Sequence, residues 1–388
     1  MKSEARTRLP LTAYRLPLLC SLLLALCSFS ALALLSCDHN PLGFDQFDRD
    51  LQEPQFPATP LVAAGSYGKF NANGRGDNMI LGRNSEYESR ILIRFPLQDS
   101  ALDSVTAVSM VLYTRSARAV PFRICPTTLE WDDYQTTWHD AKSGEPWFTE
   151  GGDFDTARLA SSVIAKDSTI IDLDQATLRT MVDHTSGIIL LPEPAAAESV
   201  NLANLYTLST SGKRPKVVVQ YGTKKRTYEA SQNTFIVDTL GLNLQISDLW
   251  VGSGYVFRSY LKFDVDSVPA NGTVVTAELK VRSDTAVGLQ DTVQLGVHRL
   301  TKDYRVSEKN APFDGTIISH RQFIANQDSV VSFDVRSLVQ FWSLKPDSNF
   351  GLLVTMEPEN ADISRVELSR RVLPGLRVGY VKPPRGKY

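Results

Sequence analysis

The chain has 388 residues, with 41 Lys and Arg against 43 Asp and Glu, a formal net charge of −2, and 43% hydrophobic residues. This length predicts two or three domains, and the ordinary composition excludes global disorder. The slightly acidic balance excludes the basic footprint that nucleic-acid binding requires.

The first 36 residues have the pattern of a secretory signal. Basic residues precede an apolar run from Leu16 to Leu35, which ends in Leu34-Leu35-Ser36-Cys37. This ending resembles a bacterial lipobox, so we predict a lipoprotein signal peptide over residues 1–36 and lipid attachment at Cys37. The protein would then lie in the bacterial cell envelope, anchored to a membrane and facing the periplasm or the cell exterior. The alternative is an uncleaved membrane anchor, because about 20 apolar residues can span a bilayer.

Residues 37–60 are acidic and contain proline without a sustained hydrophobic period, which predicts a flexible tether. Without residues 1–36, which carry four basic residues and one acidic residue, 37 basic side chains face 42 acidic ones. Cys125 is then the one cysteine beyond Cys37, so no intrachain disulfide is expected. We predict that Cys125 is a small buried hydrophobic residue rather than a nucleophile.

Much of the remaining sequence consists of two similar repeats. Arg90-Ile-Leu-Ile-Arg-Phe95 returns 168 residues later as Arg258-Ser-Tyr-Leu-Lys-Phe263, and Gly187 returns 164 residues later as Gly351. Solenoid repeats have periods of about 20–50 residues, so this period is that of a whole domain. We predict one domain over residues 61–222 and a second, more divergent one over residues 228–381, joined by the short basic linker Gly222–Arg226.

Short segments rich in Val, Ile, Thr and aromatic residues alternate with Gly, Asp, Asn and Ser clusters throughout both repeats. This pattern predicts an all-β fold of two tandem β-sandwiches. One short helix is expected in each. In the second domain Val335, Leu338, Val339 and Trp342 have helical spacing, with Asp334 as the N-cap, and residues 172–182 are the counterpart in the first domain.

Several motifs resemble a known family, the DNRLRE domain, which is also classed as family 96 of the carbohydrate-binding modules. The resemblance rests on the repeated segments Arg90–Phe95 and Arg258–Phe263, on Trp131 and Trp138, and on the closing strands Arg214–Tyr221 and Pro374–Tyr380. It implies jelly-roll-like sandwiches that serve as accessory modules and, in some members, bind polysaccharides. The tryptophan pair has no counterpart in the second domain.

A sugar site built on aromatic rings is the functional interpretation of the first repeat, because a flat ring stacks on the apolar face of a pyranose. The candidate ligand-binding residues are Trp131, Tyr134, Trp138, Trp147 and Phe148, with Arg90 and Arg214 for an anionic glycan. The structural interpretation makes Trp131 and Trp138 core residues and the arginines solvated strand positions.

Other kinds of site have weaker signals. The segment Asn71–Asn78 is rich in oxygen ligands but lacks the acid spacing of an EF-hand, so a turn is favoured over Ca²⁺, and no metal or other cofactor is expected. No catalytic motif is present, and we predict that the protein is not an enzyme. The predicted function is a non-catalytic surface lipoprotein that binds polysaccharide. The alternative is a structural or assembly protein of the envelope that docks another protein.

Overall fold

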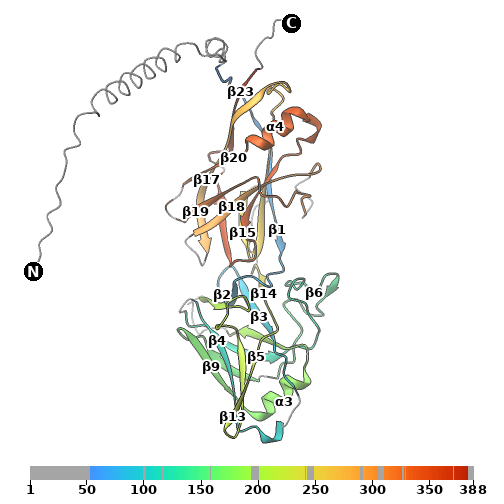
Figure 1. Ribbon diagram of the computed structural model, residues 1–388, viewed down its shortest axis with the longest axis vertical. Coiled ribbons are helices and arrows are strands. Elements are labelled where there is room, and N and C mark those ends of the chain that lie inside the picture. Colours follow the sequence, from blue (N-terminus) through green and yellow to red (C-terminus); the bar gives the residue numbers. More distant parts are fainter. Residues whose placement is uncertain are drawn as a thin grey trace, which may run out of the picture. The chain divides into compact units, whose positions relative to one another are not determined.

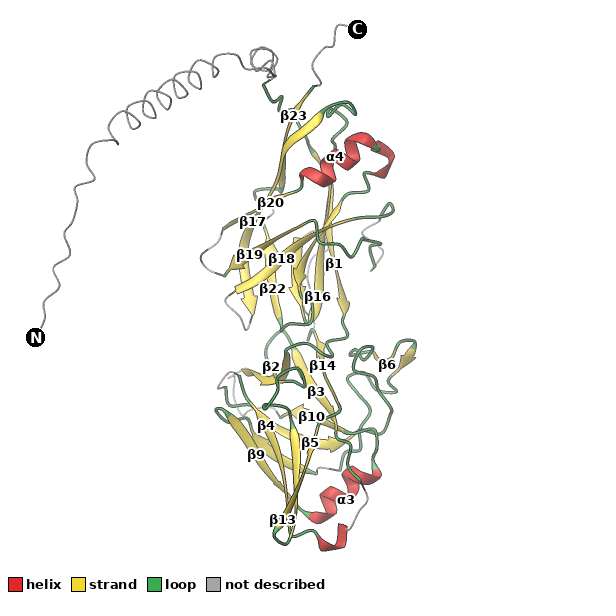
Figure 2. Cartoon of the chain, in the orientation of Figure 1, coloured by secondary structure: helices red, strands yellow, loops and turns green. Residues whose placement is uncertain are grey.

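A computed structural model describes residues 53–98, 102–115, 118–157, 159–193, 201–240, 242, 249–288, 292–304, 310–325, 327, 329–369 and 371–382. Residues Pro54–Pro383 form one compact unit. Antiparallel strands dominate it (Figures 1 and 2). The predicted all-β class is confirmed. Cys37 and most of the predicted tether lie outside the described residues.

The first sandwich consists of two sheets around one hydrophobic core. The larger sheet has the strand order β11 (Asn201–Tyr206), β2 (Asn78–Arg83), β3 (Glu88–Arg94), β10 (Ile188–Pro192), β5 (Pro121–Pro126) and β8 (Ala160–Val163), with β14 (Gln232–Asp238) also paired to β3. The smaller sheet has the order β13 (Lys224–Glu229), β12 (Lys216–Tyr221), β4 (Ala107–Tyr113) and β9 (Ser168–Leu173). A small ribbon pairs β6 (Asp140–Lys142) with β7 (Glu145–Pro146), and a 3₁₀ turn spans Leu102–Ser104.

The second sandwich is one ten-stranded sheet that closes around its own core. Its order is β19 (Ser319–Ile324), β18 (Thr292–Arg299), β21 (Leu352–Glu357), β16 (Tyr255–Phe263), β15 (Leu249–Ser253), β22 (Ser364–Leu368), β17 (Thr273–Gly288) and β20 (Val330–Asp334). Two further strands join it: β1 (Leu61–Phe70) pairs with β16, and β23 (Gly375–Val381) pairs with β17. A 3₁₀ turn spans Pro346–Ser348.

Each sandwich has one α-helix in the described part of the chain, as predicted. In the first, α3 (Gln175–Asp183) begins after Asp174, whose Oδ1 accepts the Thr177 N–H at 2.6 Å. In the second, α4 spans Arg336–Leu344. The N-cap residue there is Val335, one residue after the predicted Asp334, and its side chain makes no capping bond, although Asp334 Oδ1 accepts the Arg336 N–H at 3.1 Å. Asp334 instead ends β20.

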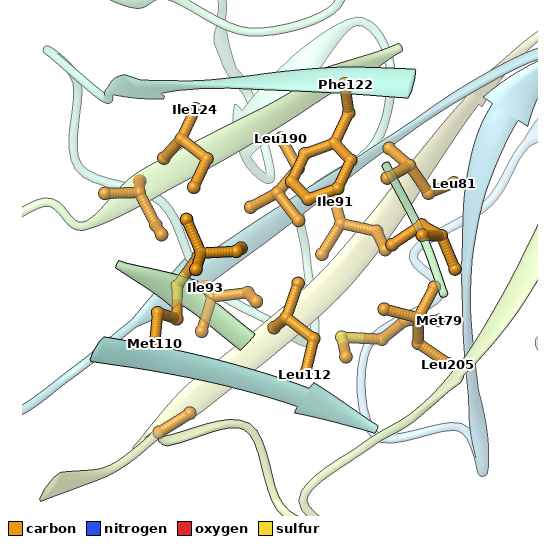
Figure 3. Packing of buried hydrophobic residues seen from close by; sticks show 14 of the residues in the cluster. Met79, Leu81, Ile91, Ile93, Met110, Leu112, Phe122, Ile124, Leu190 and Leu205 are labelled. Carbon is orange, nitrogen blue, oxygen red and sulfur yellow. The ribbon is translucent and has the colours of Figure 1, made fainter. Parts of the chain in front are cut away.

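The apolar runs in β3 and β10 are continuous because both faces of these strands are buried. Ile91 and Ile93 point into the sandwich core, where they meet Met110 and Phe122 (Figure 3). Leu92, between them, belongs to a separate cluster on the outer face of the same sheet. Side chains alternate across a strand, so an outer layer of residues is required to keep the second face from water.

The repeated glycines Gly187 and Gly351 share one steric role. Both have positive φ, +94° and +96°. A Cβ on Gly187 would lie 2.5 Å from the Ile93 carbonyl oxygen, and one on Gly351 would lie 2.7 Å from that of Leu261. Only glycine allows the chain to pass so close to the neighbouring strand.

The most unusual feature of the topology is a reciprocal exchange of strands between the sandwiches. Strand β1 precedes the first sandwich in sequence but pairs along β16 of the second, with Ala64 opposite Leu261. Strand β14 pairs along β3 of the first, with Asn233 opposite Ile93. Because Ile93 and Leu261 are equivalent in the repeat, β1 and β14 occupy equivalent places in opposite sandwiches. The boundary at residues 222–228 stays a prediction, but the sheets do not divide there.

The predicted linker has a defined structure. Gly222, with φ +58°, lies in the turn between β12 and β13, and Lys224–Glu229 form a strand along β12. One crossing between the sandwiches is the loop from Asn71 to Asp77, between β1 and β2, and the other lies between β14 and β15. The Asn73 amide, whose residue is 1% exposed, donates to the Gly254 carbonyl at 3.0 Å. The Asn78 amide donates to the Ala361 carbonyl at 2.6 Å.

The exchange predicts which sandwich a β14 substitution affects. Phe235 lies on β14, in the second repeat of the sequence, but its side chain is fully buried in the core of the first sandwich. We expect Phe235→Ala to cost about 3–5 kcal/mol of stability. Hydrogen-exchange mass spectrometry should show faster amide exchange in β3 and β10.

Phe323→Ala is the matched control, since Phe323 is equally buried in the core of the second sandwich. It should accelerate exchange in β18 and β21 instead. Loss of protection in β16 rather than β3 after Phe235→Ala would contradict the exchanged arrangement.

Candidate protein-binding site

The three tryptophans of the first repeat form an inner layer rather than a platform. Trp131, Trp138 and Trp147 are 1%, 5% and 5% exposed and pack on the outer face of the larger sheet. The Trp131 Nε1–H donates to the Ser186 carbonyl at 2.7 Å, and the Trp147 Nε1–H donates to the Thr137 carbonyl at 3.0 Å. Their rings are therefore not available for stacking from solvent.

Two other predicted aromatic residues are exposed. Phe148 is 90% exposed, next to buried Trp147, and Tyr134 is 58% exposed with the Arg75 guanidinium 4.1 Å above its ring. Cys125 lies in the tryptophan cluster and is fully buried, as predicted.

The predicted arginines fall into two places. The Arg90 guanidinium lies 4.5 Å above the Trp138 ring, and Nη1 donates to the Gly151 carbonyl at 2.7 Å. These contacts attach the covering loop to β3. Arg214 does not join this group, because its Nη1 pairs with Glu229 at 3.0 Å and its Nε donates to the Leu208 carbonyl.

The repeat equivalent of Arg90 is the centre of a buried ionic cluster in the second sandwich. Arg258 is 6% exposed and makes a two-pronged pair with Glu359, at 2.5 and 2.7 Å. Its Nη1 also donates to the Tyr67 hydroxyl of β1 at 3.3 Å. Burial lowers the pKa of Arg258, but the hydrogen bonds with Glu359 outweigh it and raise the pKa above its ordinary value. The pair thus holds the exchanged strand as well as the loop before β22.

His298 is a second buried titratable group. Its Nε2 lies 3.0 Å from Glu357 Oε1 and its Nδ1 lies 3.0 Å from the Asp314 carbonyl oxygen. Burial lowers the pKa of His298, but the bonds to Glu357 and Asp314 exceed that effect and place the pKa above its ordinary value. Both groups connect separate strands and loops of the second sandwich.

Two of the cavities among the described residues belong to the second sandwich. The smaller, about 290 Å³, includes Glu357 and Asp362 in its lining. These carboxylates already accept bonds from His298 and from the Ser253 and Ser364 hydroxyls. They therefore offer little to a ligand.

The larger cavity is a groove of about 600 Å³ between β19, β20 and the first turn of α4. We call it the β19–β20 groove. Its lining includes Ser319, His320, Arg321, Asp334, Arg336 and Gln340. Arg336 pairs with Asp334 at 2.8 Å, and its hydrogen bonds hold the pKa of Asp334 below the usual range. This site was not predicted, because nothing local in the sequence shows that β19 and β20 meet.

Two features are absent from the described residues. No helix there is long and apolar enough to cross a membrane. No group of three or more His, Cys, Asp or Glu side chains there is placed to hold a metal ion.

Comparison with known families changes the functional interpretation. Residues 213–375, fewer than half of the chain, match the model of the TGF-beta propeptide, a non-enzymatic family. The matched segment contains the whole lining of the β19–β20 groove. No curated protein matches the chain.

This match corrects several predictions. The resemblance to the DNRLRE domain was wrong, since the family model that matches is a different one. The prediction of a lipid-anchored bacterial envelope protein that binds polysaccharide was also wrong, both in its partners and in its location, because the matched family is one of secreted propeptides.

A pair of neighbouring substitutions tests the burial of the tryptophan cluster. We expect Trp147→Ala to lower the free energy of unfolding by about 3–5 kcal/mol. Phe148→Ala, the control at an exposed site, should change it by less than about 0.5 kcal/mol. Urea unfolding followed by circular dichroism measures both, and similar losses for the two variants would contradict the assignment.

The pKa of His298 predicts a pH dependence. A pKa raised on folding contributes stability that is fully present below the unfolded value, about 6.5, and is lost as the pH rises through the folded value. His298→Gln should therefore lower the urea midpoint more at about pH 5.5 than at about pH 8.5. His320→Gln, at an exposed site, should show no such difference. An equal loss for His298→Gln at both pH values would refute the linkage.

Proposed function

We propose that this chain is a non-enzymatic secreted protein that acts as a propeptide-like partner, holding a growth factor of the TGF-β type through non-covalent contacts. The observation that carries the proposal is the match of residues 213–375 to the TGF-beta propeptide. It includes every strand from β12 to β22 and so nearly all of the second sandwich.

The chemistry of the buried charges agrees with binding rather than catalysis. Three buried basic residues of the second sandwich each bond to one glutamate: Arg258 to Glu359, His298 to Glu357, and Arg365 to Glu86. Removing one partner of a buried pair is strongly destabilising, so these residues have a structural role in the fold. A rigid frame lowers the entropy lost on binding another protein.

The β19–β20 groove supplies a surface for such a partner. It lies within the matched segment and is bordered by polar and charged side chains, several of them exposed. Exposed apolar residues flank the lining residues in the chain, namely Ile317 at 40% and Val275 at 39% exposure. Protein interfaces usually combine apolar residues with a polar, solvent-accessible rim.

The test is direct binding of the full-length protein to mature TGF-β. We expect a complex that co-elutes on size exclusion and dissociates in denaturant without reduction, since the contacts are non-covalent. In a reporter-cell assay an excess of the chain should lower the signal from the growth factor. Hen lysozyme serves as a control for non-specific association. A concentration of about 10 µM of each protein is well above the Kd of a typical standard-size interface. Absence of a complex at this concentration would refute the proposal.

A further inference from the structure

Two of the edge strands of the ten-stranded sheet, β19 and β20, meet at the β19–β20 groove. Among the described residues, β19 pairs only with β18, and β20 pairs only with β17. The Arg321 Nε–H donates to the Ser332 carbonyl of β20 at 3.1 Å. This backbone acceptor therefore points away from β17 and toward β19. An uncovered strand edge is a template for pairing with another chain.

The groove also has an excess of positive charge. Among the residues that line the groove, Asp334 is the one carboxylate. The backbone N–H and the Nε of Arg336 already neutralise Asp334 through three hydrogen bonds. Arg321 bonds only to backbone carbonyls, of Ser332 and His320, and forms no ion pair with any described carboxylate. His320 and Arg321 are both exposed. With two guanidinium groups and one carboxylate, the lining has a net positive charge, which favours an anionic partner.

We propose that the β19–β20 groove binds an extended acidic segment of the protein partner, which adds as a strand along the edge of β20. The proposal rests on the proposed function for the identity of the partner and names the segment that is recognised. Charge complementarity selects this occupant, because an acidic side chain can pair with Arg321 while the backbone pairs with β20. Main-chain bonds supply affinity in this mode of recognition, and alternate side chains supply specificity.

The present contact of Arg321 suggests how the strand enters. Its guanidinium occupies the Ser332 carbonyl that a backbone N–H of the partner strand would use. A partner carboxylate offers this guanidinium a charged acceptor, which is stronger than a carbonyl. The backbone acceptor is then released to the incoming strand. With no partner present, the same arginine protects the edge.

Fluorescently labelled peptides test the inference by anisotropy with the full-length protein. The first is an eight-residue peptide of alternating Glu and Val, which places all carboxylates on one face of a strand. The second has Lys in place of Glu. The third keeps Glu but carries N-methyl groups on alternate peptide bonds, so it retains charge and loses strand pairing. Inorganic phosphate serves as a competing anion.

We expect only the first peptide to bind well and Arg321→Glu to weaken it at least about tenfold, as expected for a reversed charge at an interface. Lys225→Glu is the matched control, because Lys225 is an exposed cation on β13 of the first sandwich, and it should change binding less than about twofold. Equal binding of the N-methylated peptide, or displacement by millimolar phosphate, would show simple anion binding and overturn the strand model. Unchanged affinity in Arg321→Glu would overturn the site.

The two proposals fail separately. If TGF-β binds wild type and Arg321→Glu equally, the groove is not the recognition site, although the proposed function stands. If the acidic peptide binds as expected and TGF-β does not, the proposed function is wrong, and the groove recognises an acidic strand of another protein.

Discussion

The structure depends on the pairing of β1 with β16 and of β14 with β3. Each of these strands covers an edge in the sandwich to which it does not belong by sequence, so neither sandwich is complete without the other. The exchanged strands place backbone hydrogen bonds and core side chains such as Phe235 across the repeat boundary. The crossover loop is accordingly fixed by buried amide bonds, of which the one from Asn73 to Gly254 is the clearest.

Burial of both faces of the central strands explains the outer layers and the repeated arginine. The tryptophan cluster covers Leu92 and its neighbours on the outer face of the first sandwich. In the second sandwich Tyr260 occupies the equivalent place on β16 and packs against Tyr304. Arg90 and Arg258 each lie against an aromatic ring of that cover, Trp138 and Phe313. The same residue in the two repeats thus fastens a covering loop, and its role is to hold the layers together.

With β1 and β14 in place, the β19 and β20 edges remain available in the second sandwich. Arg321 and Arg336 differ there, since Arg336 is neutralised by Asp334 whereas Arg321 bonds only to carbonyls. An available edge beside two guanidinium groups and a single carboxylate distinguishes this groove from the smaller cavity, where serine hydroxyls and His298 bond to the carboxylates. The match to a propeptide family agrees with a surface that holds another protein.

The sequence by itself determined the features that depend on neighbours in the chain. The β-strands follow from alternating apolar residues such as Ile91 and Ile93, α4 from the spacing of Leu338, Val339 and Trp342, and the repeat from its recurring glycines. Only the tertiary structure decided which strands pair, because one β-strand edge can accept many apolar partners and the choice depends on contacts distant in sequence. It likewise decided that Trp147 is buried while Phe148 is exposed, and that β19 and β20 enclose a groove. These outcomes depend on which surfaces the fold leaves in contact with water, a global property that no local pattern contains.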